Sequence, residues 1–483
     1  MKERTTAIAI IGGGIAGLAA AYHLRSKAKE TGQETDCLLL EAQNRLGGKI
    51  LTEKVDGFII EGGPDCFISE KPAALQLCHK LEIQNHLMKT DESHQGTFIL
   101  WKGKLHKLPE GFMLLAPSDI PSFLKDPLIT PLGKLRMAMD LILPGKKSPA
   151  EETLAQFVQR RLGKEVLDKI ADPLVAGIHA SDPATMSLRS TFPRFIELEH
   201  HYRSIIRGMM KRKKQYLKYK KKSGYIPQYS LFMTLKDGLS ELPHAVASTL
   251  NRRAILTGKK VIAIERITGN VTSPPRHYAL RLSDGTTVTA QAVIAATPSF
   301  IAGDLVKDLD QSLAGNLNAI RYVSTATVSL AYRDEDSAAR WNGFGFVIPH
   351  KEKRKIMAST WSSNKFFNRA PHGNFLIRCF VGGARNEDLA LLAERQLIAL
   401  VREELADIMG ITAEPLLARA YRWEKSMPQY VVGHSDTLKR IDERLQAHPG
   451  LFLAGSAYRG IGISDCIKSG DRAAMKALEY INT

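Results

Sequence analysis

Three glycines near the start of the chain, Gly12, Gly14 and Gly17, have the G-x-G-x-x-G spacing of a diphosphate-binding turn. The first permits a tight turn, the second lets the backbone approach a diphosphate, and the third lets a helix pack closely on a strand. The free N–H groups and the positive end of the following helix favour the negative charge. The pattern therefore predicts a dinucleotide site, with a purely structural glycine-rich turn as the alternative.

The neighbouring residues have the order that such a turn needs. An apolar run, Ala7 to Ile11, precedes the glycines, a helix-forming stretch from Ile15 to about Lys29 follows them, and a second apolar run, Cys37 to Leu40, ends at Glu41. This order predicts a strand–helix–strand unit. A carboxylate at Glu41 can accept hydrogen bonds from both hydroxyls of an adenosine ribose, and it disfavours a ribose with a 2′-phosphate.

The residues after Glu41 indicate which dinucleotide is bound. Glu41 to Lys49 reads E-A-Q-N-R-L-G-G-K, and Glu61-Gly62-Gly63-Pro64 follows shortly after it. This combination resembles the FAD-dependent amine oxidase superfamily, and the resemblance implies FAD. We expect the FAD to be bound non-covalently, because no Cys or His lies in a run expected at the methyl edge of the flavin. Arg45 and Lys49 would offer cations to the diphosphate, and the paired glycines would let the backbone approach the ribityl chain and flavin ring.

The C-terminal segment contains a second strand-to-helix junction. Leu451 to Ala454 is a strand candidate that leads through Gly455 to the run Gly460–Asp465 and a helix ending near Tyr480. We expect Asp465 to be the N-cap of this helix, whose N-terminus would stabilise negative charge on the flavin. Ser456 stands where the superfamily usually has aspartate, which argues against a typical amine oxidase.

Further runs resemble a narrower family, the oxygen-dependent protoporphyrinogen and coproporphyrinogen oxidases of haem synthesis, of the type found in Gram-positive bacteria. These runs are Asp56–Phe67, Asp172–Ala180, Ser187–Pro193, Trp423–Tyr430 and Gly460–Gly470. The resemblance implies α/β and α+β architecture, with a discontinuous Rossmann-like FAD domain, a mixed-sheet substrate domain and a helical insertion domain that is often membrane-associated. On this chain the FAD domain would comprise residues 1–70, 229–300 and 420–483, the substrate domain 71–100 and 301–419, and the helical domain 101–228.

The resemblance also implies the residues of the site. Lys71 matches a basic position suited to a propionate, Gly177 lies in the G-I-H-A-S-D run near the tetrapyrrole, and Phe380 stands where related enzymes have an aromatic residue, commonly tyrosine. No side chain is assigned as a catalytic acid or base. The residues expected around FAD are Gly12, Gly13, Gly14, Ile15, Ala16, Gly17, Glu41, Ala42, Arg45, Gly48, Lys49, Gly62, Gly63, Pro64, Asp65, Val261, Trp423, Gly455, Ile461, Ile463 and Ser464.

The implied reaction is the six-electron oxidation of a porphyrinogen, in which flavin takes hydride in repeated cycles and O2 receives the electrons as H2O2. The resemblance to the Gram-positive type implies coproporphyrinogen III as substrate, and its four propionates suit a basic pocket better than the two of protoporphyrinogen IX, the second candidate. An amine oxidase or carotenoid desaturase, and a tetrapyrrole or flavin carrier without catalytic activity, remain open as alternatives.

The composition limits the classes of protein to which the chain can belong. The chain has 483 residues, 24% charged and 44% apolar, which is typical of a globular protein of about three domains. The five cysteines are scattered without a C-x-x-C pair and the 14 histidines show no metal spacing, so we expect no disulfide framework and no metal. Neither a membrane-spanning stretch nor a signal peptide is apparent, and the expected location is the cytoplasm.

Much of the net charge of +17 comes from one segment of the chain. Arg203 to Lys222 contains ten Lys and Arg residues and no Asp or Glu. We interpret this run as a solvated, mobile surface loop, with an anionic membrane surface or an entrance for an acidic substrate as alternatives. Nucleic acid is disfavoured because no basic–aromatic recognition module surrounds the run. Contact with the inner face of the membrane, or with the next enzyme of the haem pathway, stays open.

Hydrophobic periodicity predicts the elements that position these residues. The middle of the chain has helical patterns over 133–143 and 153–170, and a charged helix is expected over about 386–409. Strands are expected over 261–267, 278–282, 287–296, 326–332 and 375–381. This order fits a helical insertion between segments that contain strands.

Overall fold

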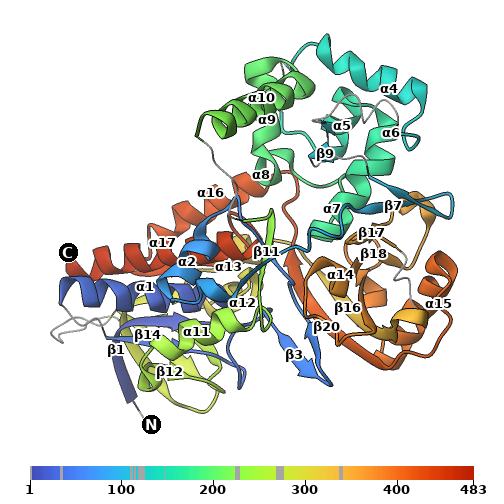
Figure 1. The fold of residues 1–483 in the computed structure, drawn as a ribbon. Coiled ribbons are helices and arrows are strands. Elements are labelled where there is room, and N and C mark those ends of the chain that lie inside the picture. Colours follow the sequence, from blue (N-terminus) through green and yellow to red (C-terminus); the bar gives the residue numbers. More distant parts are fainter. Residues whose placement is uncertain are drawn as a thin grey trace.

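The computed structural model describes residues 3–32, 36–108, 112–113, 116–117, 126–146, 148, 150–223, 229–267, 277–336 and 341–483. Figure 1 shows a helix-flanked sheet with both chain ends in its part of the molecule, a second large sheet beside it, and a group of helices at the top of the view. This arrangement confirms the predicted fold class. The domain ranges stay a prediction, and the boundary at 228 lies outside the described residues.

The first sheet contains the strand–helix–strand unit predicted from the glycine turn. β1 pairs in parallel with β2 and with β15, and β21 pairs in parallel with the C-terminal part of β15. The sheet order is β12 (Ile255–Leu256), β2 (Cys37–Leu40), β1 (Glu3–Ile11), β15 (Thr287–Ala295), β14 (Tyr278–Leu282) and β13 (Val261–Arg266), with β21 (Leu451–Leu453) beside β15. The strands predicted for these segments are confirmed, and only their ends differ.

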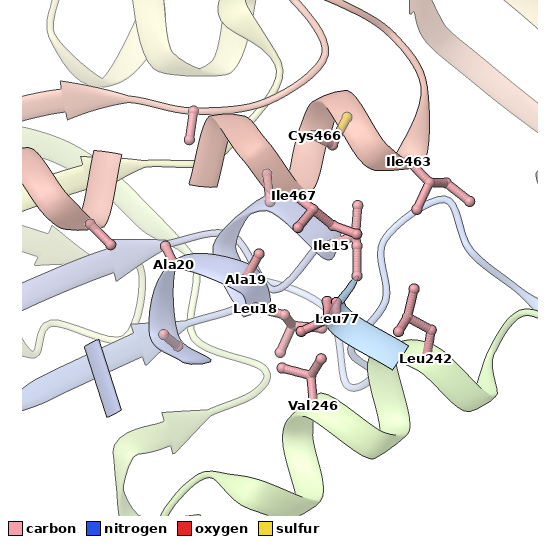
Figure 2. Packing of buried hydrophobic residues seen from close by; sticks show 14 of the residues in the cluster. Ile15, Leu18, Ala19, Ala20, Leu77, Leu242, Val246, Ile463, Cys466 and Ile467 are labelled. Carbon is pink, nitrogen blue, oxygen red and sulfur yellow. The ribbon is translucent and has the colours of Figure 1, made fainter. Parts of the chain in front are cut away.

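Helices from distant parts of the chain cover one face of this sheet. They are α1 (Ile15–Thr31), α2 (Ala73–Lys80), α11 (Glu241–Thr249) and α17 (Ile463–Asn482), and their apolar side chains form one core (Figure 2). A Cβ on Gly470 would lie 2.0 Å from the Ala16 carbonyl oxygen, so α1 and α17 pack with their backbones in close contact. The other core contains α12 (Ser299–Leu305), α13 (Gln311–Asn318) and α16 (His434–Leu445).

The second sheet is mostly antiparallel. Its order is β20 (Leu417–Pro428), β16 (Tyr322–Arg333), β19 (Asn374–Gly382), β18 (Ile356–Trp361), β17 (Gly345–Val347), β7 (Phe98–Trp101) and β8 (Lys104–Lys107). β8 and β20 both belong to this sheet, so it extends past the boundaries predicted after residues 100 and 419. The helix predicted over 386–409 begins only at Glu394 (α15, Glu394–Met409), because Ala393 is extended and follows a separate 3-10 turn, Glu387–Leu391.

Two small sheets connect these parts. One is the hairpin of β3 (Thr52–Val55) and β4 (Phe58–Glu61), and the other contains β5 (Phe67–Ile68), β11 (Phe232–Leu235) and β6 (Leu87–Lys89). The hairpin turn, Asp56-Gly57, has positive φ at both residues, as a tight two-residue hairpin requires.

The helical part contains α4 (Pro131–Ala138), α5 (Leu154–Arg161), α6 (Lys164–Val166), α7 (Asp172–His179), α8 (Leu188–Thr191), α9 (Pro193–Tyr202) and α10 (Ile205–Ser223). The helix predicted over 153–170 is interrupted after α5, where Gly163 has φ +95°. The helix predicted over 133–143 ends at Ala138 and continues as a 3-10 turn, Met139–Leu141.

The basic run forms a helix, so the prediction of a loop was wrong, while its mobility stays a prediction. Arg203, with a left-handed φ of +55°, ends α9, and α10 begins at Ile205. Ile205, Ile206 and Met209 are buried in the core of the helical part. These apolar residues anchor the first turns of α10, and the high charge of the run concealed their helical spacing.

A fully buried ion pair lies in the helical part. The Asp140 carboxylate accepts hydrogen bonds from Arg161 Nε at 2.6 Å, Ser204 Oγ at 2.6 Å and the Ile206 N–H at 2.9 Å. Both charged side chains are 0% exposed. Removing one partner of such a pair leaves the other charge buried without compensation.

We expect Asp140→Ala to lower the free energy of unfolding by about 3–5 kcal/mol. Chemical denaturation of the purified protein measures this change. Asp407→Ala is the control, because Asp407 is 69% exposed in its ion pair with Arg354 and such pairs contribute about 0–1 kcal/mol. Equal losses in the two variants would contradict the structural role of Asp140.

Candidate functional site

The glycine turn lies between β1 and α1. Gly12 has φ +105°, and a Cβ on Gly17 would lie 2.0 Å from the Gly12 carbonyl oxygen, so both positions require glycine. A Cβ on Gly14 would meet nothing within 4 Å. Gly14 is the N-cap of α1 and no side chain caps the helix, which leaves the first N–H groups available to an anion.

Glu41 faces this turn from the end of β2. One carboxylate oxygen accepts the Gly13 N–H at 2.6 Å and the other accepts the Gln43 N–H at 2.7 Å. Ile15 and Ala16 are buried in the core, so only their backbone can face a ligand. The geometry places the predicted ribose acid next to the predicted diphosphate turn.

The loop after Glu41 closes over the turn. Gly47 forms an isolated β-bridge with Gly14. Arg45 folds back on the loop and donates to the Gly48 carbonyl oxygen at 2.6 Å, while Ala42 is exposed. The Arg45 contacts therefore shape the part of the loop that lies against the first turn of α1.

Lys49 leaves this loop in the direction of β20. Its ammonium donates to the Ser426 carbonyl oxygen and lies 5.9 Å from the centre of the Tyr322 ring. Burial lowers the pKa of Lys49 to about 8. The Lys49 side chain therefore links the loop after Glu41 to the second sheet.

Gly62 and Gly63 follow β4 and are bound by side chains from three neighbouring strands of the second sheet. The Gly62 carbonyl oxygen accepts hydrogen bonds from Trp423 Nε1 on β20 and Thr327 Oγ1 on β16, both at 2.8 Å. The Gly63 carbonyl oxygen accepts one from Arg378 on β19. A Cβ on Gly62 or Gly63 would come within 2.9 Å of a neighbouring atom. The glycines therefore let this segment pass between the two sheets.

Asp65 belongs to a group of buried charges beyond these glycines and Pro64. The Lys365 ammonium lies 2.8 Å from the Asp65 carboxylate and 3.3 Å from Cys66 Sγ. Burial alone would raise the pKa of Asp65, but Lys365 and Arg378 hold it below its usual range. Burial also opposes the charge of Lys365, yet Asp65 and Cys66 raise the pKa of Lys365 to about 12. The Asp65 carboxylate is thus already paired with a protein cation.

α17 begins at the second glycine-rich turn. Gly462 is its extended N-cap and Ile463 its first residue, so the prediction that Asp465 is the N-cap was wrong. Asp465 lies in the first turn of the helix, and its carboxylate accepts the Gly462 N–H at 3.3 Å. A Cβ on Gly460 would lie 2.4 Å from Asp465. The helix thus starts earlier than predicted, and Asp465, inside its first turn, accepts the N–H of the N-cap Gly462.

The N-terminus of α17 also contacts Lys71. Ser464 Oγ donates to the Lys71 carbonyl oxygen at 2.8 Å, and the Lys71 ammonium lies 2.6 Å from Asp465 Oδ2. Only the backbone of Ser464 is therefore available to a cofactor. The Lys71 side chain is 55% exposed, and a substrate carboxylate that binds it would compete with Asp465.

The three residues predicted to bind substrate are distributed around α7. A Cβ on Gly177 would lie 3.5 Å from Ala358 Cβ, and Ala358 pairs with Phe380 across β18 and β19. At the end of α7, burial and secondarily the Lys71 ammonium lower the pKa of His179 to about 4. Gly177 and Phe380 therefore meet the same residue of β18, and Lys71 acts electrostatically on the C-terminal end of α7.

The residues present fit an FAD molecule. Gly14 offers open space and uncapped N–H groups to the diphosphate, and Glu41 offers a carboxylate to the ribose. The Lys259 N–H donates to the Glu41 carbonyl oxygen at 2.8 Å, which places the start of β13, at Val261, beside the ribose position. Gly455 follows β21 and Ile461 precedes α17, where the backbone could approach the flavin end. Burial raises the pKa of Cys466 to about 12, which disfavours the reactive thiolate. Non-covalent binding stays a prediction.

The sequence pattern did not point to Thr327, Lys365 and Arg378. Their partners in the segment after β4 lie 265 to 315 positions earlier in the chain, and local spacing does not encode such contacts. The one available signal was the charge of Arg378 within the apolar strand pattern N-F-L-I-R-C-F-V-G.

One group with metal-ligand chemistry was also not identified. His86, Asp237 and Glu241 have ligand atoms within 4.8 Å of one another. The Lys54 ammonium, however, lies 2.8 Å from Asp237, and His86 lies 2.7 Å from Glu241. These contacts give both carboxylates protein partners, and we assign no metal to them.

Comparison with known proteins agrees with this site. Residues 15–478 match the family model of flavin containing amine oxidoreductases. The coproporphyrinogen III oxidase of Bacillus subtilis is 36% identical, with 100% of both chains covered, and that of Staphylococcus aureus is 31% identical, with 98% of this chain and 99% of the relative covered. Protoporphyrinogen oxidase 1 of Arabidopsis thaliana is 28% identical, with 99% of this chain and 89% of the relative covered.

Solved structures support the same fold. A structure from Exiguobacterium sp. 255-15 matches with a TM-score of 0.83 and 29% identity, covering 100% of this chain and 99% of the other. UDP-galactopyranose mutase matches with a TM-score of 0.69 and 15% identity, covering 98% and 96%, which shows the shared fold alone. The chain therefore belongs to the flavin-containing amine oxidoreductase family and is an FAD-dependent oxidoreductase.

Proposed function

We propose that the protein oxidises coproporphyrinogen III to coproporphyrin III. The substrate loses six electrons and six hydrogens, and three O2 molecules take them up as three H2O2. The observation that carries this proposal is the sequence identity of 36% and 31%, over nearly the whole chain, to the coproporphyrinogen III oxidases of two Gram-positive bacteria. Protoporphyrinogen IX is the second candidate, because relatives named for it are also similar over nearly the whole chain.

FAD supplies the acceptor of hydride from the substrate and the route of electrons to O2. The protein contributes binding, orientation and exclusion of water. Gly177, without a side chain, and the ring of Phe380 would leave an apolar surface for a flat macrocycle, and Lys71 would bind a propionate at the exposed edge. Fixing the ring against the cofactor lowers the entropic part of the barrier without a strong acid or base.

We further propose a peripheral membrane contact through the helical part. The side chains of α4 and the following turn leave Leu132 and Ile142 each 79% exposed and Leu135 66% exposed. The turn after α4 packs beside α10, so the apolar group adjoins the basic helix. Apolar side chains next to Lys and Arg are typical of surfaces that bind anionic lipids. Among the described residues no helix is both long and apolar enough to cross a bilayer.

Anaerobic mixing of the oxidised enzyme with each porphyrinogen tests the substrate. We expect coproporphyrinogen III to bleach the flavin faster than protoporphyrinogen IX at equal concentration. In air, the product should form with three H2O2 per porphyrin. Faster bleaching by protoporphyrinogen would favour the second candidate, and binding without bleaching by either would indicate a carrier.

We expect Lys71→Ala to raise KM for coproporphyrinogen about tenfold with a smaller effect on kcat, since an anchoring contact acts in ground and transition states alike. Tenfold corresponds to about 1.4 kcal/mol, near the lower end for charge-assisted contacts, because Asp465 already partners Lys71. Asp465→Asn should lower KM while Lys71 is present and have no such effect in the Lys71→Ala background.

A porphyrinogen tetraester is the control for this prediction, because it lacks the anionic propionates. Its KM should be nearly indifferent to Lys71→Ala. A fall in kcat of equal size for acid and ester would show that Lys71 acts on the cofactor or ring geometry instead.

The membrane contact is tested by converting Lys211, Arg212, Lys213 and Lys214 to Gln. We expect weaker sedimentation with phosphatidylserine vesicles at low salt, because each basic residue contributes about 1 kcal/mol near such a surface, and an unchanged kcat. Leu135→Ser should also weaken binding, but without the salt dependence. Vesicle binding unaffected by both changes would contradict the proposed surface.

A further inference from the structure

Arg378 has buried hydrogen-bond donors that no protein group uses. Its side chain lies on β19 and is 3% exposed. One nitrogen, Nη2, donates to the Gly63 carbonyl oxygen, but Nε and Nη1 have no partner among the described residues. Buried donors without a partner are costly and rare. A group that is bound in the functioning protein is therefore expected to face them.

The neighbouring carboxylates do not supply this partner. Asp65 is occupied by Lys365, and Glu61 accepts from Thr52 Oγ1 at 2.7 Å and from the Leu239 N–H at 2.8 Å. Arg378 forms no ion pair within 4.0 Å in the described part of the chain. Burial lowers the pKa of Arg378, and the more distant Asp65 and Glu61 offset this only in part. The guanidinium thus lacks a close counter-charge.

Two contacts define the direction of Arg378. Its bonded nitrogen donates to the carbonyl oxygen of Gly63, a residue that the resemblance places beside the flavin. Its guanidinium carbon lies 4.7 Å from the centre of the Phe380 ring, and Phe380 is the predicted substrate-side aromatic residue. Arg378 therefore lies between Gly63, at the predicted FAD site, and the Phe380 ring, and its charge is buried away from solvent.

We propose that Arg378 is a catalytic residue that stabilises the negative charge acquired by the flavin ring on reduction, through donors at Nε and Nη1. A fixed cation beside the ring favours the reduced, anionic form over the neutral oxidised form. This role requires only bound FAD and does not depend on which porphyrinogen is the substrate. A substrate carboxylate, the other source of an anion, is an outcome of the test.

Inorganic sulfite is a suitable probe, because it adds reversibly to an oxidised flavin and leaves the ring negatively charged. We expect Arg378→Met to raise the sulfite dissociation constant of the FAD-bound protein at least tenfold. The flavin midpoint potential should fall as well. Each tenfold loss in the equilibrium constant for reduction corresponds to about 30 mV, since the couple transfers two electrons. Arg378→Lys, which keeps the charge but loses the planar fork, should give an intermediate value.

Arg369→Lys is the matched control. Arg369 is 2% exposed, but its donors bind the Lys236 and Leu235 carbonyl oxygens and Thr234 Oγ1. This change should lower thermal stability while the sulfite constant and potential stay near the wild-type values. Both quantities can be measured without porphyrinogen, so they remain informative if the proposed substrate is wrong.

Unchanged sulfite affinity and potential in FAD-bound Arg378→Met would overturn the proposal. So would a rise in KM for the tetra-acid alone, with an unchanged tetraester and potential, because it would assign Arg378 to a substrate carboxylate. If neither Arg378 variant retains FAD, the wild-type protein decides, since failure of sulfite to bleach its flavin would contradict a cation placed to stabilise the anionic ring.

Discussion

The binding of the Gly62–Gly63 backbone by side chains of the second sheet is the contact on which the arrangement of the site depends. Hydride transfer requires the cofactor and the substrate to be held at close range, yet the FAD cradle and the predicted substrate surface come from different sheets. Trp423, Thr327 and Arg378 donate from three adjacent strands to two consecutive carbonyl groups. Because these donors are fixed by strand pairing, the cradle is positioned relative to the sheet that contains Phe380.

The charges of the site fall into two groups with different exposure. Asp65, Lys365 and Arg378 form the more buried group, where charge interactions are weakly screened and would act on the electronic properties of a flavin bound beside them. Lys71 and Asp465 form the more exposed pair at the N-terminus of α17, where a substrate carboxylate can exchange with a protein carboxylate. The first group suits a permanent cofactor, and the second suits a ligand that enters and leaves.

The helical part is built differently from the two sheets. Its core contains the fully buried pair of Asp140 and Arg161, while its surface exposes leucine and isoleucine beside basic α10. α7 belongs to this part in sequence but packs against β17 and β18 of the second sheet. The same insertion therefore supplies one wall of the predicted substrate site and the surface proposed to contact a membrane.

The sequence by itself determined the elements whose chemistry is local: the glycine turn, Glu41 at the end of β2, and the parallel strands around them. These follow from spacing along a few residues, because tight turns and strand periodicity are encoded in neighbouring positions. Residue spacing did not reveal that α10 is a helix, that Asp465 lies inside α17, or that Lys71 is paired with Asp465. Only the tertiary structure decided these points and brought Arg378 to Gly63, because they depend on packing and charge pairing between segments far apart in the chain.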